Sequence, residues 1–267
     1  MKIMNNIKIF CSWDLKFDLL HEKQVELYVD TLPNTYKPKD VVRFIFLLEP
    51  SEILDLSSHV LNNTHLFDYV FTHNEKLLKE DRIKSVLFPF GTTWIKDYKF
   101  PEKKFEVSTL ISCRWLIPGH DLRKKLWYKQ KRIIVPTNFY LSSKHIEGIE
   151  NFTNSPFIEE SKSPLFDSQF HIVIENAKKY NWFTEKIIDC LVTKTVPIYW
   201  GCPNIGDWFN LKGFFIVDNL ADIVNFSNSL TPETYNNMKE YVEENYNKAL
   251  EYADISKRLQ TEILKKL

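Results

Sequence analysis

The sequence predicts an α/β protein with two Rossmann-like lobes facing a cleft and a helix at its C-terminal end. Three observations lead to this prediction. Short apolar runs alternate with amphipathic segments, which is typical of parallel sheets covered by helices. The alternation stops in a polar stretch, residues 92–106, and then starts again. Beyond residue 231, apolar residues recur at helical spacing.

Length and composition agree with a packed globule. A chain of 267 residues exceeds one small core, so one large domain or two lobes is expected. Hydrophobic residues make up 44% of the chain and aromatic residues 15%, which argues against disorder. The 35 basic residues balance 35 acidic ones, so the chain lacks the overall charge of a nucleic-acid binder. The N-terminus carries no long apolar run, and we expect a cytoplasmic protein.

The first predicted lobe spans residues 1–100 and is followed by the polar linker. Its strands are runs rich in β-branched and aromatic residues, and its helices are the amphipathic stretches between them. We expect strands at residues 7–13, 41–49, 68–73 and 85–91, and helices at residues 51–63 and 74–80.

The second predicted lobe spans residues 105–230. We expect strands at residues 107–113, 132–137, 170–176, 196–201 and 214–219, and helices at residues 119–130 and from Glu185 onward. Residues 140–168 are polar and show no clear period. Thr231-Pro232 then begins a C-terminal helical segment, residues 231–267, because proline suits the first helical position.

An adjacent charged pair, Glu185 and Lys186, opens the helix after the strand at residues 170–176. Parallel sheets bind ligands beyond the carboxyl ends of their strands, and helix N-termini favour anions. A lysine in the first helical turn is locally unfavourable because the helix dipole repels it, and an anionic ligand would reverse that effect. The alternative is an ordinary exposed lysine that pairs with a neighbour.

Several common motifs are missing. The chain has no G-x-G-x-x-G and no G-x-x-x-x-G-K-[ST], which disfavours dinucleotide-binding and P-loop proteins. It has no D-x-D, its seven histidines are scattered and its four cysteines lack metal spacing, so we expect no metal site. An anion in the cleft must then be neutralised by side chains, and Lys186 and Arg123 are the leading candidates.

Residues 170–210, FHIVIENAKKYNWFTEKIIDCLVTKTVPIYWGCPNIGDWFN, resemble the donor-binding segment of the glycosyltransferase family 10 fucosyltransferases. That family carries F-x-x-x-F-E-N-S, Y-x-T-E-K-I-x-[DN]-A and T-[IV]-P-[IV]-Y-x-G in this order. The resemblance implies the GT-B architecture and a metal-independent, inverting transfer of fucose from GDP-fucose to a hydroxyl of a glycan. No further cofactor is implied.

The same resemblance implies residue roles in the donor site. Lys186 matches the lysine that holds the donor diphosphate, and Glu185 matches the glutamate that bonds the nucleotide. Asn176 matches the asparagine of the E-N pair. Trp182 stands where the family usually has tyrosine, and Ala177 replaces the customary serine.

Two further roles come from weaker similarity. The segment LISCRWLIPGHDLRKKLW resembles the one whose arginine also reaches the diphosphate, and we align Arg123 there, with Arg114 as a competitor. The segment FIFLLEPSEI resembles the strand end that supplies the general base, which nominates Glu49. Each residue has a simpler alternative: Glu49 would cap a helix at Ser51, and Arg123 would lie on a solvated helix face.

The function also has alternatives. The chain could transfer another sugar from a different nucleotide donor, or be a non-catalytic, glycan-binding relative that kept the fold. From the resemblance alone we expect an acceptor glycan containing β-linked galactose or N-acetylglucosamine. Trp182 and Phe183 could instead be core residues. The basic end of the chain could contact a membrane surface weakly, through Lys257, Arg258, Lys265 and Lys266.

Overall fold

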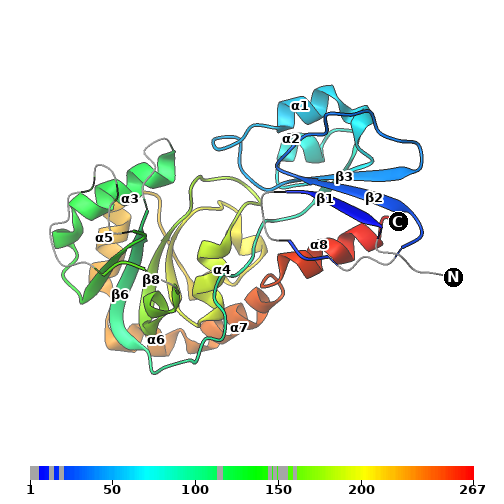
Figure 1. Ribbon diagram of the computed structural model, residues 1–267. Helices are drawn as coiled ribbons and strands as arrows, with labels where there is room; N and C mark the ends of the chain where they lie inside the picture. The colour runs from blue at the N-terminus through cyan, green and yellow to red at the C-terminus, as the bar shows by residue number, and fades with distance from the viewer. Residues whose placement is uncertain are drawn as a thin grey trace. The chain divides into compact units, whose positions relative to one another are not determined.

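The computed structural model describes residues 6–11, 15–17, 21–112, 117–143, 146, 149, 156–158 and 161–267 (Figure 1). The chain forms two compact units. Unit 1 consists of Met1–Phe90, Tyr180–Trp182 and Asp254–Leu267, and unit 2 of Gly91–Lys179 and Phe183–Ala253. Each unit contains one five-stranded sheet in which all neighbouring strands run parallel. The predicted pair of parallel sheets is therefore confirmed.

The sheet of unit 1 follows chain order. Its strands are β1 (Ile7–Phe10), β2 (Gln24–Val29), β3 (Val41–Leu47), β4 (Tyr69–Thr72) and β5 (Lys84–Leu87), each beside the next. Its helices are α1 (Ser57–Asn62), α2 (Glu75–Leu78) and α8 (Ile255–Leu264). In Figure 1, α1 and α2 lie on one side of this sheet and α8 on the other. Because both faces are covered, β3 is buried along most of its length.

The sheet of unit 2 has a reversal in strand order. Its strands are β6 (Lys104–Ile111), β7 (Thr137–Leu141), β8 (Ser168–Ile174), β9 (Val196–Trp200) and β10 (Phe215–Ile216), in the order β10-β9-β8-β6-β7. The chain passes from β6 outward to β7 and returns to the other side of β6 as β8. This reversal is the topological switch point at which such sheets bind ligands.

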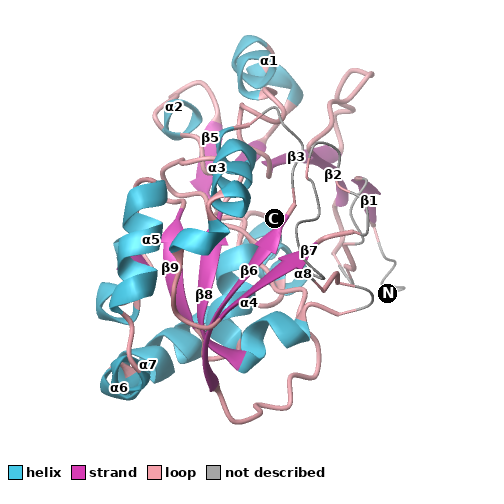
Figure 2. Cartoon of the chain, turned by 90° about the vertical axis from the view of Figure 1, so that its left-hand side faces the viewer, coloured by secondary structure: helices cyan, strands magenta, loops and turns pink. Residues whose placement is uncertain are grey.

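Helices cover both faces of this second sheet. α3 (Pro118–Tyr128) and α5 (Leu220–Ser229) lie in front of it in Figure 2, and α4 (Glu185–Val192) lies behind it. α6 (Pro232–Asn237) and α7 (Lys239–Leu250) complete the unit. Each face has an apolar cluster: one contains Leu126, Trp127 and Ile198, and the other contains Phe183, Ile187 and Tyr199. These clusters hold α3 and α4 against the strand ends.

Two predicted elements begin several residues later in the structure than expected. The strand expected at residues 132–137 is β7, which begins only at Thr137, directly after Pro136. Proline has no N–H to donate to the ladder, which suits a strand boundary. The helix expected at residues 51–63 is shorter and begins at Ser57. β2 and α5 were not predicted at all.

The C-terminal segment, predicted as one helical unit at residues 231–267, is three helices divided between both units. α6 and α7 belong to unit 2, whereas α8 belongs to unit 1. The break falls at Asp254, whose carboxylate caps α8 by accepting a hydrogen bond from Lys257 N (2.9 Å). No helix in the described part of the chain has the length and apolar character to cross a membrane.

Several of the basic residues proposed for membrane contact have intramolecular partners. Arg258 donates to Pro89 O (3.1 Å) and lies over the Phe88 ring, 4.5 Å from its centroid. Lys265 pairs with Glu262 (2.5 Å). A membrane contact through this helix stays a prediction.

Candidate functional site

Arg123 lies at the switch point of unit 2. Its guanidinium donates to Ser112 O at the end of β6 (3.3 Å) and to Ile174 O at the end of β8. It also donates to the side-chain oxygen of Asn176 (3.1 Å). One cationic side chain therefore connects the carboxyl ends of the two strands between which the strand order reverses.

Gly119 brings the first turn of α3 close enough for this contact. Its N–H donates to Asn176 O (3.0 Å), and a Cβ added there would lie 1.8 Å from Glu175 O. Only glycine permits this approach. Arg123 is consequently buried, whereas Lys125 of the same helix pairs with Asp121 on the exposed face (2.6 Å). The alternative that places Arg123 on the solvated face is not what the structure shows.

Glu175 joins the end of β8 to the start of α4. Its carboxylate accepts hydrogen bonds from Thr184 N (2.9 Å) and from the Thr184 hydroxyl (2.6 Å). Thr184 is the N-cap of α4 and accepts in turn from Lys186 N (3.3 Å). These contacts fix the first turn of α4 at the same sheet edge that holds Asn176.

Lys186 is compensated by carboxylates within the chain. Its Nζ lies 3.1 Å from Glu185 Oε1 and 3.8 Å from Glu175 Oε2, and 26% of its side chain is exposed. Burial raises the pKa of Glu175, although Lys186 opposes the shift. Burial would also raise the pKa of Glu185, but Lys186 and Lys162 outweigh it and lower that pKa to about 2. The unfavourable helix-start lysine therefore has an internal explanation that requires no ligand.

Three charged residues of this site escaped the sequence analysis. Lys162 Nζ lies 3.6 Å from both Glu185 Oε1 and Asp189 Oδ2. Burial raises the pKa of Asp189 to about 6, although Lys162 opposes the shift. Lys162 lies within the polar stretch at residues 140–168, whose lack of a period gave no signal. Glu175 could have been found, because it is a charged residue directly after the apolar end of a strand, residues 172–174.

Glu49, the nominated general base, belongs to unit 1 and follows β3. Its N–H donates to the carboxylate of the half-buried Asp30 (3.2 Å to Oδ2), as does Leu48 N (2.8 Å to Oδ1). Glu49 lines a small hollow together with His73 at the carboxyl ends of β3 and β4. The N-cap of α1 is Leu56, so Glu49 does not cap that helix.

Trp182 also belongs to unit 1, and its ring is fully buried. The indole N–H donates to Leu48 O (2.9 Å), the carbonyl that precedes Glu49. Phe183 is buried in unit 2 against Phe209 and Tyr252. Both rings are packing residues in this structure, and a contact between Trp182 and a donor stays a prediction.

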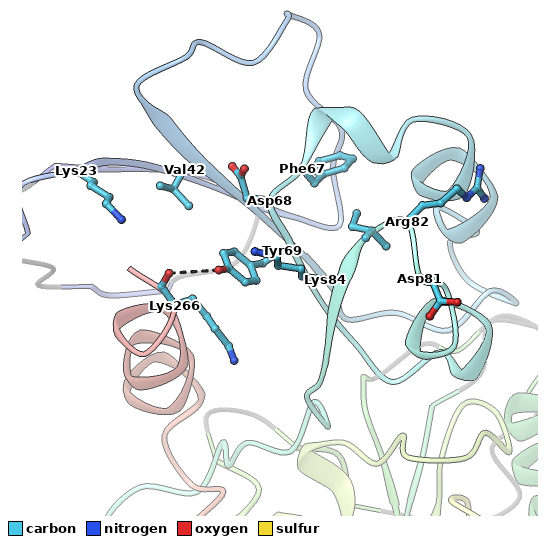
Figure 3. A pocket seen from close by; sticks show the side chains of 10 residues that line it. Lys23, Val42, Phe67, Asp68, Tyr69, Asp81, Arg82, Lys84 and Lys266 are labelled. Carbon is cyan, nitrogen blue, oxygen red and sulfur yellow. Dashed lines mark hydrogen bonds between the residues drawn. The ribbon is translucent and has the colours of Figure 1, made fainter.

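A second hollow in unit 1, of about 440 Å³, is shown in Figure 3. Lys23, Tyr69, Lys84 and Lys266 contribute to its lining, and Tyr69 donates to Lys266 O (3.5 Å). It lies where β3, β4 and β5 begin, which is the sheet edge opposite to the one that carries Glu49. Because parallel sheets bind their ligands at the carboxyl ends, we leave it outside the candidate site.

Two sequence predictions, the role of Arg114 and the absence of a metal site, involve residues that the structure does not describe. Arg114, the competitor of Arg123, lies outside the described residues. Within the described ranges, no group of three or more His, Cys, Asp or Glu side chains is arranged to hold a metal ion.

Comparison with known sequences gives one local match. The chain is 39% identical over 66 residues to the alpha-(1,3)-fucosyltransferase FucT of Helicobacter pylori. Over this segment the chain is similar to an alpha-(1,3)-fucosyltransferase. The aligned segment covers 25% of this chain and 13% of that relative. No family model matches the chain.

Solved structures confirm the GT-B fold. An alpha1,3-fucosyltransferase with GDP-fucose superposes with a TM-score of 0.53 and 19% identity, covering 85% of this chain and 76% of the other. The pneumococcal O-GlcNAc transferase GtfA, in complex with UDP and GlcNAc, gives 0.55 and 10%, covering 90% and 56%. At these identities the likeness concerns the fold alone.

Proposed function

We propose that the chain is a fucosyltransferase-like glycosyltransferase that moves fucose from GDP-fucose to a hydroxyl of a glycan. The observation that carries the proposal is the buried guanidinium of Arg123 at the switch point, bonded to Asn176. This is the sheet edge at which α/β folds bind nucleotides, and the local similarity to an alpha-(1,3)-fucosyltransferase favours a GDP-sugar there.

The charged side chains of unit 2 suit a nucleoside diphosphate leaving group. As the bond to the sugar breaks, negative charge develops on the diphosphate, and positioned cations stabilise it. Arg123 and Lys186 take this role in our proposal. Glu185, whose pKa of about 2 keeps it ionised, accepts hydrogen bonds from the nucleotide, and Asn176 completes the donor-binding set of unit 2.

We further propose that transfer inverts the anomeric configuration and requires no metal. Inversion needs one base to take the proton from the acceptor hydroxyl as that hydroxyl attacks the anomeric carbon. Glu49 is our candidate, supported by its position directly after a strand of unit 1 and by the family resemblance. The proposed acceptor is a glycan with β-linked galactose or N-acetylglucosamine, and the proposed location is the cytoplasm.

A different nucleotide-sugar donor remains the second candidate. It is supported by the fold similarity to an O-GlcNAc transferase in complex with UDP. A third candidate is a glycan-binding relative without activity. The ring of Trp182 is fully buried, and a ring that only packs would not contact a donor.

Titration calorimetry with GDP, UDP and CMP tests the donor assignment. We expect GDP to bind best, with an affinity better than about millimolar, about 4 kcal/mol of binding free energy. Slow release of fucose from GDP-fucose without acceptor would separate a transferase from a binder, which releases none. If no nucleotide binds, the proposal fails. An acceptor screen that yields transfer only to protein serine or threonine would reject the glycan acceptor.

A further inference from the structure

Five ionisable side chains form a continuous line at the start of α4: Glu175, Lys186, Glu185, Lys162 and Asp189. Lys186 Nζ lies 3.8 Å from Glu175 Oε2 and 3.1 Å from Glu185 Oε1. Lys162 Nζ lies 3.6 Å from the same Glu185 oxygen and 3.6 Å from Asp189 Oδ2. The charges alternate in sign, so every carboxylate has a lysine beside it.

The carboxylates of this line are deeply buried. The exposed fractions of the side chains are 0% for Glu175, 5% for Glu185 and 1% for Asp189. A buried charge is costly unless an opposite charge and hydrogen bonds compensate it. The two lysines therefore supply the opposite charge that these buried carboxylates need for compensation.

Lys162 is held in place by more than its two carboxylates. Its ammonium lies over the ring of Trp94, 4.0 Å from the centroid. The backbone N–H of Trp94 and the hydroxyl of Thr93 both donate to Asp189 Oδ1 (2.7 Å each). Asp189 thus orders the segment that covers Lys162, and 17% of the lysine side chain remains exposed.

Lys186 already pairs with the carboxylates of Glu175 and Glu185. In the proposed function it also binds the diphosphate. A diphosphate that attracts its ammonium would weaken the compensation of Glu185. Lys162 contacts the same Glu185 oxygen and is not one of the groups assigned to the diphosphate.

We propose that Lys162 is a positioning residue for the donor: it compensates the buried charge of Glu185 while Lys186 engages the diphosphate. This inference rests on the proposed function. Lys162 acts through Glu185, which keeps its place and its capacity to accept hydrogen bonds from the nucleotide.

The electrostatics of the site agree with this role. The pKa of Glu185 is about 2 because Lys186 and Lys162 together outweigh the effect of burial. Without Lys162, burial and the neighbouring carboxylates Glu175 and Asp189 would be opposed by Lys186 alone. The Glu185 pKa would then rise, and it would rise further when a diphosphate attracts Lys186.

The test measures GDP affinity by calorimetry at about pH 7. We expect Lys162→Met to weaken binding relative to the wild type by about tenfold, the effect of one pKa unit of lost charge compensation at Glu185. Lys162→Arg keeps the charge and should bind almost as the wild type does. Lys248→Met, which removes an exposed lysine paired with Glu251 in α7, is the matched control.

A double-mutant cycle with Glu185→Gln completes the design. Once Glu185 carries no charge, Lys162→Met should cause no further change in affinity. Lys162→Gln gives the same comparison should the methionine variant fold poorly. An equal loss in the Glu185→Gln background would overturn the proposal, because a packing defect does not depend on the charge of Glu185. Wild-type affinity in Lys162→Met and Lys162→Gln would overturn it too. A wild-type chain that binds no GDP would instead reject the proposed function itself.

Discussion

The guanidinium of Arg123 donates a hydrogen bond to the side-chain oxygen of Asn176 (3.1 Å), although the two residues are 53 positions apart in the chain. The contact joins the first turns of α3 to the end of β8. It depends on Gly119, which lets the helix backbone approach the strand end. A cation and an amide are thus presented together at the switch point of unit 2.

Lys186→Ala should weaken GDP binding by about 10–150-fold. The change removes a charge-assisted hydrogen bond, which contributes roughly 1.5–3 kcal/mol. Calorimetry at neutral pH measures the effect, and Lys248→Ala, in an exposed pair on α7, should leave binding unchanged. Normal GDP affinity in Lys186→Ala would show that this lysine is an ordinary helix-start residue.

Glu49→Gln should lower the rate of transfer by about 10²-fold or more while GDP affinity stays nearly constant. The substitution keeps the shape of the side chain and removes the proposed base. The neighbouring, exposed Glu52→Gln is the control. Stability should change little, because the backbone N–H of Glu49 makes the bond to Asp30. A parallel loss of GDP affinity would place Glu49 in the donor site instead.

Transfer should persist in EDTA. In the proposed mechanism, Arg123 and Lys186 supply the positive charge that a divalent ion supplies in many nucleotide-sugar enzymes. Chelation should then leave the initial rate within about a factor of two of the untreated enzyme. The measurement is the initial rate with GDP-fucose before and after chelation. A complete loss of activity that Mn²⁺ restores would contradict the assignment of the diphosphate site.

Asp30 should make the protein less stable as the pH rises from about 4 to 6. Burial raises its pKa to about 6, although hydrogen bonds from Leu48 N and Glu49 N oppose the shift. Because the folded state holds this proton more tightly than the unfolded state, folded stability falls as pH rises from the unfolded pKa, about 3.9, through the folded value. The loss is on the order of 3 kcal/mol.

Asp30→Asn should flatten this part of the stability profile. The asparagine oxygen can still accept both backbone hydrogen bonds but carries no charge. Urea unfolding midpoints across this pH range measure the effect. Asp55→Asn, at an exposed site, should leave the decline in place, and part of it should persist in any case because the pKa of Asp189 is also about 6. An unchanged profile in Asp30→Asn would show that Asp30 is not its source.

The alternation of strands and helices could be predicted from the sequence because each element repeats its own apolar period. β3, β8 and β9 are short runs of mostly buried residues, which is typical of strands in a parallel sheet covered on both faces. The start of α4 was equally clear, since an apolar stripe begins after Thr184. The family motif in residues 170–210 then singled out Lys186 and Glu185. Periodicity and motif are local properties, so the chain itself displays them.

Long-range placement needed the tertiary structure. Lys162 meets Glu185 and Asp189 because the segment before β8 packs beside α4, and no local pattern encodes that contact. The division of the C-terminal stripe is similar: its apolar period continues, but the capping carboxylate of Asp254 starts a new helix that packs in the other unit. The burial of a side chain and the charges beside it depend on which distant elements come into contact. Those contacts are set by the packing of the whole chain and not by any local pattern.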